Sequence, residues 1–396
     1  MVRVARVQEV AFEEEIPAPA PRFTDEEARL KSFGLAVDAI RKRIEAEVGE
    51  DDVRYVTELN RFSKRMEVLG RGLIHASPGP ASFSAGVFCL WIHKQLQAIE
   101  IGHTALHGAY DKLEGAEEFH SSSFRWQIPI DEESWRKGHN VRHHQYTNIA
   151  HKDIDINFGG IRLTEQTPHR FGHYLQVPLV FLISWPFFGA AMNLHFTGML
   201  DVYGHQGWED QYDMIETKDW ETIKDVHKRA FRKFIPYFAK EYVFFPALAG
   251  PLFGKVMLGN WLSDRMRDIY SAATIYCGHV GEDVASYPPG TRAGGRGKWY
   301  AMQVEASNNF KVSHPFNILC GGLEHQIEHH LFPKLPPQRL RQIAPEIEVA
   351  CRDHGVKYRN ESWGRTLWKA IKHVAKLSRP SNAVLPAVRR VASEMV

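Results

Sequence analysis

Histidine clusters at three widely separated places restrict how this 396-residue chain can fold. The clusters are His103-x3-His107, His139-x3-His143-His144 and His325-x3-His329-His330. On a helix, residues four apart share a face, and the next residue is rotated by about 100°. One pair in each cluster can therefore reach one ion, and the adjacent histidine can reach a second. We expect a fold that gathers these distant segments around a pair of metal ions.

The residues around the clusters narrow the choice of metal. Zinc hydrolases with an HExxH motif need glutamate directly after the first histidine, and Thr104 occupies that position. Structural zinc sites have four ligands and usually include cysteine, but the four cysteines of this chain form no CxxC pair. An all-histidine site for two metals that combines Lewis acidity with redox chemistry indicates iron.

Long apolar segments indicate a helical membrane protein. Residues 174–200 carry no formal charge, residues 241–262 form a second apolar stretch, and residues 72–93 are uncharged but interrupted by ASPGPASFS. A membrane-spanning helix needs about 20 mainly apolar residues. The mean hydropathy of −0.34 is low for such a protein. A soluble helical protein is the alternative, although long charged helices at both ends would also explain the average.

The composition divides the chain into four regions. Residues 1–23 have the Pro/Ala/Glu character of a disordered arm and lack the apolar core of a signal peptide. Residues 24–70 have the apolar spacing of amphipathic helices. Residues 71–358 contain the apolar segments and all three clusters. Residues 359–396 form a basic amphipathic helix and a tail, which suits anionic lipid or solvent.

Charge and cysteine content exclude some partners and compartments. The net charge is only +2, and the basic residues do not gather into the concentrated face that a nucleic-acid partner requires. Scattered cysteines fit a reducing compartment.

The sequence around the clusters resembles the membrane fatty-acid desaturase family. The segments that carry the likeness are EIGHTALHGAYD, HNVRHHQYTN, KDIDIN, YCGHVGED and GGLEHQIEHHLFPKLPP, and it extends from about Asp52 to Tyr358. The likeness is to bacterial acyl-lipid or acyl-CoA desaturases related to the front-end type. It implies an all-α integral membrane bundle of about four transmembrane helices, with a cytosolic cap that holds two irons. It also implies O2-dependent insertion of a cis double bond into an acyl chain, in a bacterial inner membrane with the active site and both termini cytoplasmic.

The resemblance also assigns metal ligands. They are His103, His107, His139, His143, His144, His279, His329 and His330. His279 rests on the resemblance alone, because a single histidine in an apolar segment is otherwise a core residue. At the start of the third cluster, many relatives have glutamine where this chain has Gln326, whereas His325 beside it offers an imidazole. Both His325 and Gln326 are therefore candidate ligands.

Polar residues near the clusters are expected to hydrogen-bond the ligands and fix their tautomers. The candidates, each of which could equally be an ordinary polar residue, are Glu100, Asp111, Asn140, Thr147, Asn148, Asp153, Asp155, Glu324 and Glu328. Trp135 is a candidate for the wall of the acyl path or for ordinary packing. We expect His151 at the surface or beside the ligands.

Electrons for such a reaction must come from a separate protein. Some relatives have a fused cytochrome b5 domain with an HPGG-type motif, whereas the HP pair of this chain is followed by Phe316. Ferredoxin with its reductase or, less favoured, cytochrome b5 is the expected donor, and an acyl-lipid or acyl-CoA is the expected substrate. Four basic residues lie near the second cluster, namely Arg136, Lys137, Arg142 and Lys152. They would either dock an acidic electron donor or form an ordinary solvated face. Two other functions stay open, a lipid hydroxylase on the same scaffold and a non-enzymatic metal-binding protein.

Overall fold

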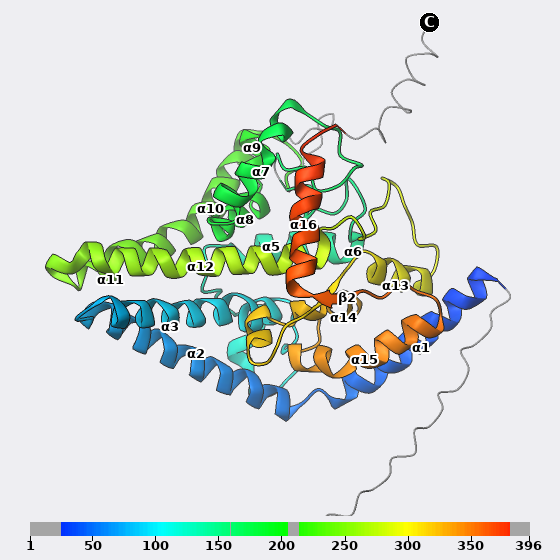
Figure 1. Ribbon diagram of the computed structural model, residues 1–396, viewed down its shortest axis with the longest axis horizontal. Helices are drawn as coiled ribbons and strands as arrows, with labels where there is room; N and C mark the ends of the chain where they lie inside the picture. Colours follow the sequence, from blue (N-terminus) through cyan, green and yellow to red (C-terminus); the bar gives the residue numbers. More distant parts are fainter. Residues whose placement is uncertain (1–24, 159, 205–213, 381–396) are drawn as a thin grey trace, which may run out of the picture.

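Helices make up most of the computed structural model, which describes residues 25–158, 160–204 and 214–380 (Figure 1). This agrees with the predicted all-α class. The predicted disordered arm, residues 1–23, and the end of the predicted tail lie outside the described residues. Two short parallel strands, β1 (Asn309–Lys311) and β2 (Asn360–Ser362), pair with each other. The strands were not predicted, because three residues are too few to show an alternating pattern.

The first helical arm is the hairpin of α2 (Glu50–Ala76) and α3 (Pro80–Ala98). The predicted break in ASPGPASFS is the turn between them, and Pro80 occupies the first turn of α3, where its missing N–H costs no hydrogen bond. The two helices lie side by side (Figure 1). Their backbones approach closely at Gly70 and Gly86, since a Cβ on Gly70 would lie 2.6 Å from the Leu90 nitrogen.

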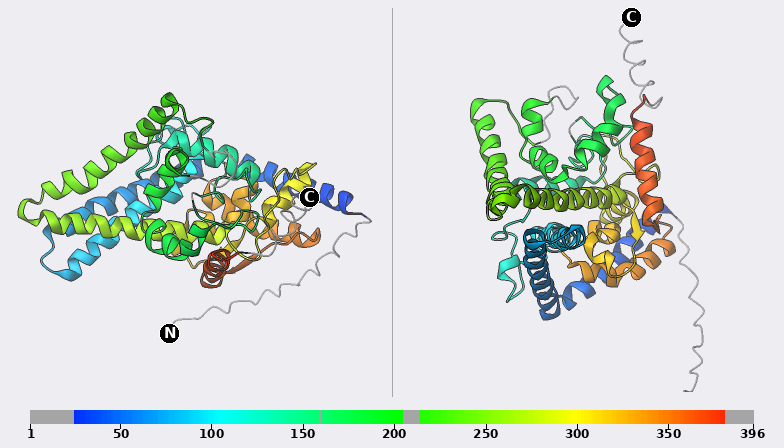
Figure 2. Two further views of the ribbon diagram at one scale, coloured as in Figure 1. Left: turned by 90° about the horizontal axis from the view of Figure 1, so that it is seen from above. Right: turned by 60° about the vertical axis from the view of Figure 1, so that its left-hand side comes forward.

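The second arm consists of α10 (Trp220–Ala239) and α12 (Phe253–His279), and α12 packs against α3. The chain reverses between them through a π-helical turn (Lys240–Phe244), α11 (Phe245–Ala247) and a 3-10 turn (Gly250–Leu252). Figure 2 shows α10 and α12 diverging from this tip. The prediction of one span over residues 241–262 is therefore wrong. Gly250, with φ of 52°, and the prolines at 246 and 251 interrupt the helix.

Residues 174–200 also do not form one straight helix, which corrects the first predicted span. A 3-10 turn (Phe171–Leu175), α7 (Gln176–Pro178) and a π-helical turn (Leu179–Ser184) lead into a sharp bend before α8 (Phe188–Phe196) and α9 (Met199–Tyr203). The two halves meet at 111°, next to Pro186, whose ring disfavours a continuous helix. Among the described residues no single helix has the length and apolar composition of a membrane span, although this bent pair does when its halves are taken together.

A helical cap covers the base of both arms. It consists of α1 (Glu26–Glu47), α13 (Arg296–Glu305), α14 (Gln326–Leu331) and α15 (Pro337–Asp353), which share a buried core. Asp25 caps α1, with its carboxylate accepting a hydrogen bond from the Ala28 nitrogen at 2.6 Å. Pro333 disfavours a helical conformation at Phe332, and α14 accordingly ends at Leu331, with Phe332 outside the helical region at φ of −140° and ψ of 66°. The amphipathic helix α16 (Trp363–Leu377) packs against α12.

Several short helical turns connect the longer helices. They are a π-helical turn (Ile99–His103), α4 (Thr104–Leu106), a 3-10 turn (Glu117–Phe119), α5 (Glu132–Trp135), a π-helical turn (Arg136–His143), α6 (His144–Tyr146), and 3-10 turns at Phe316–Cys320 and Leu323–His325. All three histidine clusters are on or beside these turns.

The contact between α2 and α3 makes a first prediction. Gly70→Leu should lower the thermal unfolding midpoint of the full chain, because overpacking costs about 1–3 kcal/mol and here the obstacle is backbone. Gly72→Leu is the matched control, since a Cβ there has no neighbour within 4 Å. Equal midpoints for the two variants would contradict the close packing.

Candidate metal centre

Two π-helical turns present the first two histidine clusters. His103 ends the turn Ile99–His103, and His139 and His143 lie in the turn Arg136–His143. At the end of the latter, the His144 N–H donates to the His139 carbonyl, an i to i+5 bond that widens the helix. The second cluster was predicted to lie on an α-helix, and its helix is instead π-helical from Arg136 to His143. The rings of His139 and His143 still stack at 4.8 Å, and His144 comes within 4.9 Å of His139.

The histidines converge into two buried groups. Their ligand nitrogens lie within 4.8 Å of one another in a first group of His103, His107, His139 and His329, and in a second of His143, His279 and His330. The second and third clusters each contribute one histidine to the first group, His139 and His329, and one to the second group, His143 and His330. His144 lies between the groups, with its ring 4.7 Å from that of His107 and stacked on His330 at 4.4 Å.

The nitrogen positions fit metal ions. The Nε2 atoms of His103 and His107 are 3.1 Å apart, and those of His279 and His330 are 2.8 Å apart. Two nitrogens at about 2.0–2.1 Å from one ion have such a separation when they are nearly at right angles. Four further Nε2 atoms are buried without a partner among the described residues, those of His139, His143, His144 and His329. Buried polar atoms normally have partners, so these lone pairs are available to ions.

Carboxylates support the second cluster from behind. Asp155 lies 3.0 Å from His139 Nδ1, and Asp153 lies 2.9 Å from His143 Nδ1. Asp153 is itself fixed, since it accepts from the backbone nitrogens of Asn148 at 2.7 Å and Asp155 at 2.9 Å. Each carboxylate favours a proton on Nδ1 and leaves Nε2 free as a ligand atom.

Oxygen atoms support the second group as well. His330 Nδ1 lies 3.0 Å from Thr147 Oγ1 and 3.2 Å from Gln303 Oε1, and His279 Nδ1 lies 3.3 Å from the Ala306 carbonyl. Thr147 Oγ1 also donates to Gln303 at 2.8 Å. The Nε2 atoms of this group therefore face the centre.

Burial keeps most of these imidazoles neutral. Desolvation, reinforced by the neighbouring histidines, places the pKa values of His144, His329 and His330 well below the ordinary value. His143 differs. Burial lowers its pKa, but Asp153 and Asp155 outweigh burial and raise that pKa to about 9. The carboxylates thus stabilise positive charge beside His143, which a cation can supply in place of a proton.

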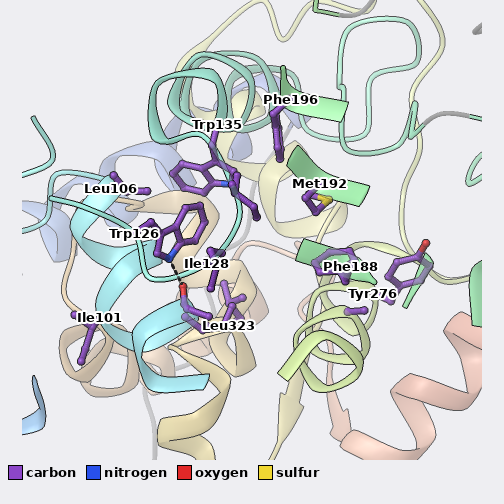
Figure 3. Close-up of a cluster of buried hydrophobic side chains, with 14 of the residues drawn as sticks. Ile101, Leu106, Trp126, Ile128, Trp135, Phe188, Met192, Phe196, Tyr276 and Leu323 are labelled. Atoms are coloured by element: carbon purple, nitrogen blue, oxygen red, sulfur yellow. Dashed lines mark hydrogen bonds between the residues drawn. The ribbon is translucent and has the colours of Figure 1, made fainter. Parts of the chain in front are cut away.

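An apolar cavity adjoins the histidines. Its walls include the side chains of His103, His139 and His279, together with Trp135, Ile99 and Ile275. Figure 3 shows Trp126 and Ile128 on one side of this region and Phe188 and Met192 on the other, and all four line the cavity. The Trp126 indole is held in place by a 2.9 Å bond from Nε1 to the Ala98 carbonyl. A metal pair here would face a space suited to a hydrocarbon.

The family model for fatty acid desaturase matches residues 78–362, which contain every histidine of both groups. The chain belongs to this family. It is a fatty acyl desaturase by this match and by its relatives. A NADPH-dependent stearoyl-CoA 9-desaturase of Mycobacterium tuberculosis is 30% identical over 360 residues, which cover 89% of this chain and 81% of the relative.

Acyl-lipid desaturases are also similar to this desaturase. An sn-1 linoleoyl-lipid 6-desaturase of Synechocystis is 26% identical over 66% of the chain and 71% of its own length. An acyl-lipid (8-3)-desaturase of Physcomitrium patens is 28% identical over 74% of the chain and 59% of its own length.

The structure separates the two candidates at the start of the third cluster. Gln326 is buried, and its Nε2 atom lies 2.6 Å from His279 Nε2. His325 instead precedes α14 with its side chain 22% exposed, and its Nδ1 lies 3.7 Å from Glu328. The turn before α14 directs adjacent side chains apart. Gln326 is thus at the second histidine group, whereas His325 is outside both groups.

Several predicted support residues of the desaturase bind elsewhere. Glu100, three residues before His103, is buried and forms a two-pronged pair with Arg341 at 3.0 Å, and Glu324 binds the same arginine at 2.6 Å. Asp111 is exposed and accepts from the Ser121 nitrogen at 2.6 Å and hydroxyl at 2.7 Å. Glu100 and Glu324 thus join the turns before His103 and before α14 through Arg341, whereas Asp111 holds the loop at Ser121.

The other predicted support residues also form hydrogen bonds to the backbone or to side chains near the helical cap. Asn140 donates to the Leu106 carbonyl at 2.9 Å, and Glu328 accepts from Asn309 at 2.7 Å and Tyr358 at 2.9 Å. Asn148 takes a left-handed φ of 54° and donates to the Ala285 carbonyl at 3.0 Å. His151, also left-handed, is partly exposed. Arg136 donates to the Ser121 carbonyl at 2.8 Å.

Sequence reasoning missed two residues that matter here, Gln303 and Arg341. Gln303 contacts His330 and Thr147, and Arg341 joins Glu100 to Glu324. A single glutamine or arginine in a helix carries no motif. Only the glutamates themselves were a signal, because buried carboxylates need a cationic partner.

The support of His143 makes a second prediction. Asp153→Asn should weaken metal affinity by roughly 10–100-fold, because the charge behind the ligand is lost. The measurement is metal bound per chain after dialysis at graded free Fe2+. Asp111→Asn is the matched control and should retain native affinity. An equal loss in both variants would refute the assigned support.

Proposed function

We propose that this desaturase holds two iron ions and inserts a cis double bond into a saturated stretch of a fatty acyl chain. The reaction would consume O2 and two electrons from a separate donor. The observation that carries the proposal is the pair of buried histidine groups on the wall of an apolar cavity. The ligands would be His103, His107, His139 and His329 for one ion and His143, His279, His330 and Gln326 for the other, with His144 between.

In the proposed reaction the metal ions and the protein have separate roles. The bound irons would supply the oxidising power that removes hydrogen from an unactivated methylene. Asp153 and Asp155 keep protons on the Nδ1 atoms and direct Nε2 inward. The cavity walls exclude water and orient the chain, since apolar side chains such as Ile128, Phe188 and Met192 offer no hydrogen bond. The methylenes facing His103, His139 and His279 are then the ones that react.

We further propose an acyl-CoA or acyl-lipid substrate and a separate reductase system. The relatives are named for both substrate classes, and one name specifies NADPH dependence. Ferredoxin with its reductase, or cytochrome b5, would supply single electrons. The exposed Lys137 and Lys152 and the half-buried Arg142 near the second cluster would meet an acidic donor.

Exposed apolar side chains support insertion of the arms into a bacterial inner membrane. At the second arm's tip, Val243 is 60% exposed and Leu248 65% exposed, and the bent segment exposes Leu182 to 72%. Clustered apolar exposure of this kind is typical of membrane or protein contact. In this arrangement residues 71–358 form the membrane and catalytic domain together with α2 of the first arm, and α1 and residues 359–380 pack beside it on the cytoplasmic side.

Expression in a host that lacks the activity tests the proposed function. Native chain should yield fatty acids lacking two hydrogens, with the double bond located by mass spectrometry, and His143→Ala should abolish them because a ligand is lost. Gln145→Ala, which changes an exposed side chain two residues away, is the matched control for expression. Oxygen added without unsaturation would instead show a hydroxylase, and full unsaturation in His143→Ala would contradict the metal site.

The third cluster permits a sharper test of the ligand set. Gln326→Ala should lower the iron bound per chain, because it removes the side chain next to His279. His325→Ala should leave iron content unchanged, since that imidazole is outside both groups. Iron content by elemental analysis decides the matter, and the reverse pattern would assign His325 as the ligand.

A further inference from the structure

An ion pair on α12 closes the far end of the apolar cavity. Arg267 and Asp268 line the cavity together with Gly189 of α8, and the metal-facing end is lined by His279 of the same helix. Between the two ends α12 contributes Ser271 and Ile275 to the wall. The spacing from 268 through 271 and 275 to 279 is that of one helical face. The cavity therefore runs along α12 from the histidines to the ion pair.

The helix sets the length of this path. Eleven residues separate Asp268 from His279, and an α-helix rises 1.5 Å per residue, so the path is roughly 16 Å long. A fully extended peptide advances about 3.3–3.6 Å for three backbone bonds, so a hydrocarbon needs roughly 14 bonds for that distance. An acyl tail beyond the reacting carbons fits this range.

The ion pair is a rigid wall and not a binding site for a polar group. Arg267 donates to Asp268 from Nε at 3.1 Å and from Nη2 at 2.7 Å, while Nη1 donates to Tyr237 at 2.6 Å and to Asp264 at 3.2 Å. Asp268 also accepts from the Gly189 nitrogen at 3.2 Å and pairs with Arg265 at 3.2 Å. Because every nitrogen of Arg267 is engaged, a substrate carboxylate would have to break existing bonds.

A second apolar cavity lies behind the pair. Arg267 and Asp268 line it too, together with Pro129, Ala190, Tyr237 and Trp261. Phe187 and Trp261, which line it as well, are 45% and 42% exposed, so this cavity opens to the surface. The ion pair thus separates the enclosed cavity at the histidines from an aromatic groove that could take more chain.

We propose that Arg267 and Asp268 form the stop that limits how far an acyl tail extends beyond the reacting carbons. The proposal rests on the proposed function and adds the determinant of tail length. A longer tail would have to displace a buried, fully bonded pair, whereas a tail that ends at the pair leaves its bonds intact. Discrimination by a single methylene in an apolar pocket is roughly 10-fold or more.

Opening the wall should lengthen the accepted tail. In Arg267→Ala/Asp268→Ala both charges and most of the side-chain volume are removed together, since removing a buried pair as a whole is tolerated better than breaking it. Cells supplied with saturated fatty acids of graded length should then form unsaturated products with longer tails, and the ratio of long to short products should rise by roughly tenfold. An unchanged ratio with active enzyme overturns the stop.

Two further variants keep the test decisive if the double variant folds poorly. Gly189→Ala keeps both charged side chains of the ion pair, and its new methyl would lie 3.2 Å from Asp268 Oδ1 at the end of the cavity. It should shift products toward shorter tails. Ala190→Leu fills only the second cavity, so alone it should change nothing, but added to the double variant it should reverse the gain. A longer tail in Gly189→Ala would contradict the proposal.

A binding measurement separates this proposal from the proposed function. Saturated acyl chains of graded length should displace a fluorescent fatty acid from the purified full-length protein, kept without an electron donor so that no turnover occurs, with a length limit that rises in the double variant. If the limit shifts but the native enzyme forms no unsaturated product, the proposed function fails and the stop stands. If native enzyme desaturates but neither the limit nor the product ratio shifts, only the stop fails.

Discussion

Lone pairs of buried imidazoles need a cation, and this requirement organises the whole structure around the two histidine groups. Neutral histidine nitrogens only 2.8–3.1 Å apart, and others without a partner, are costly to bury. The histidines of the two groups come from α12, α14 and three short turns, so those elements must meet at one place. Apo protein should therefore be the less stable form, because metal binding contributes directly to folding.

Buried charge fixes how the arms meet this centre. Lys94 of α3 binds Glu241 at 2.9 Å and Asp264 of α12 at 2.6 Å, and Arg71 of α2 binds Glu241 at 2.7 Å. These bonds join four segments in one network. Removing one partner of a buried pair typically costs about 3–5 kcal/mol, so sliding or rotating one helix past another would be unfavourable. The Arg267–Asp268 wall of the cavity is the inner end of the same network.

Much of the candidate metal centre could be predicted, because its histidines occur in short motifs whose spacing can be read directly from the sequence. The spacing of His103 and His107, and of the two clusters with adjacent histidines, required convergence on two ions, and the structure brings them together in two groups. Asp153 and Asp155 were also expected as supports, and both lie behind histidines. Asp111 and Glu100 were expected in the same role because they are close in sequence to His107 and His103. Their carboxylates instead bind Ser121 and Arg341.

The sequence by itself determined the helical class, the turn at ASPGPASFS, the end of α14 and the chemistry of the histidine clusters, since each depends on residues a few positions apart. The tertiary structure alone decided which histidine joins which group, the placement of Gln326 beside His279 and of His325 outside both groups, and the partners of Glu100. It also decided that residues 174–200 and 241–262 bend instead of running straight. Those outcomes depend on the backbone direction at single turns and on contacts between residues more than a hundred positions apart. Neither of these produces a periodic pattern in the sequence.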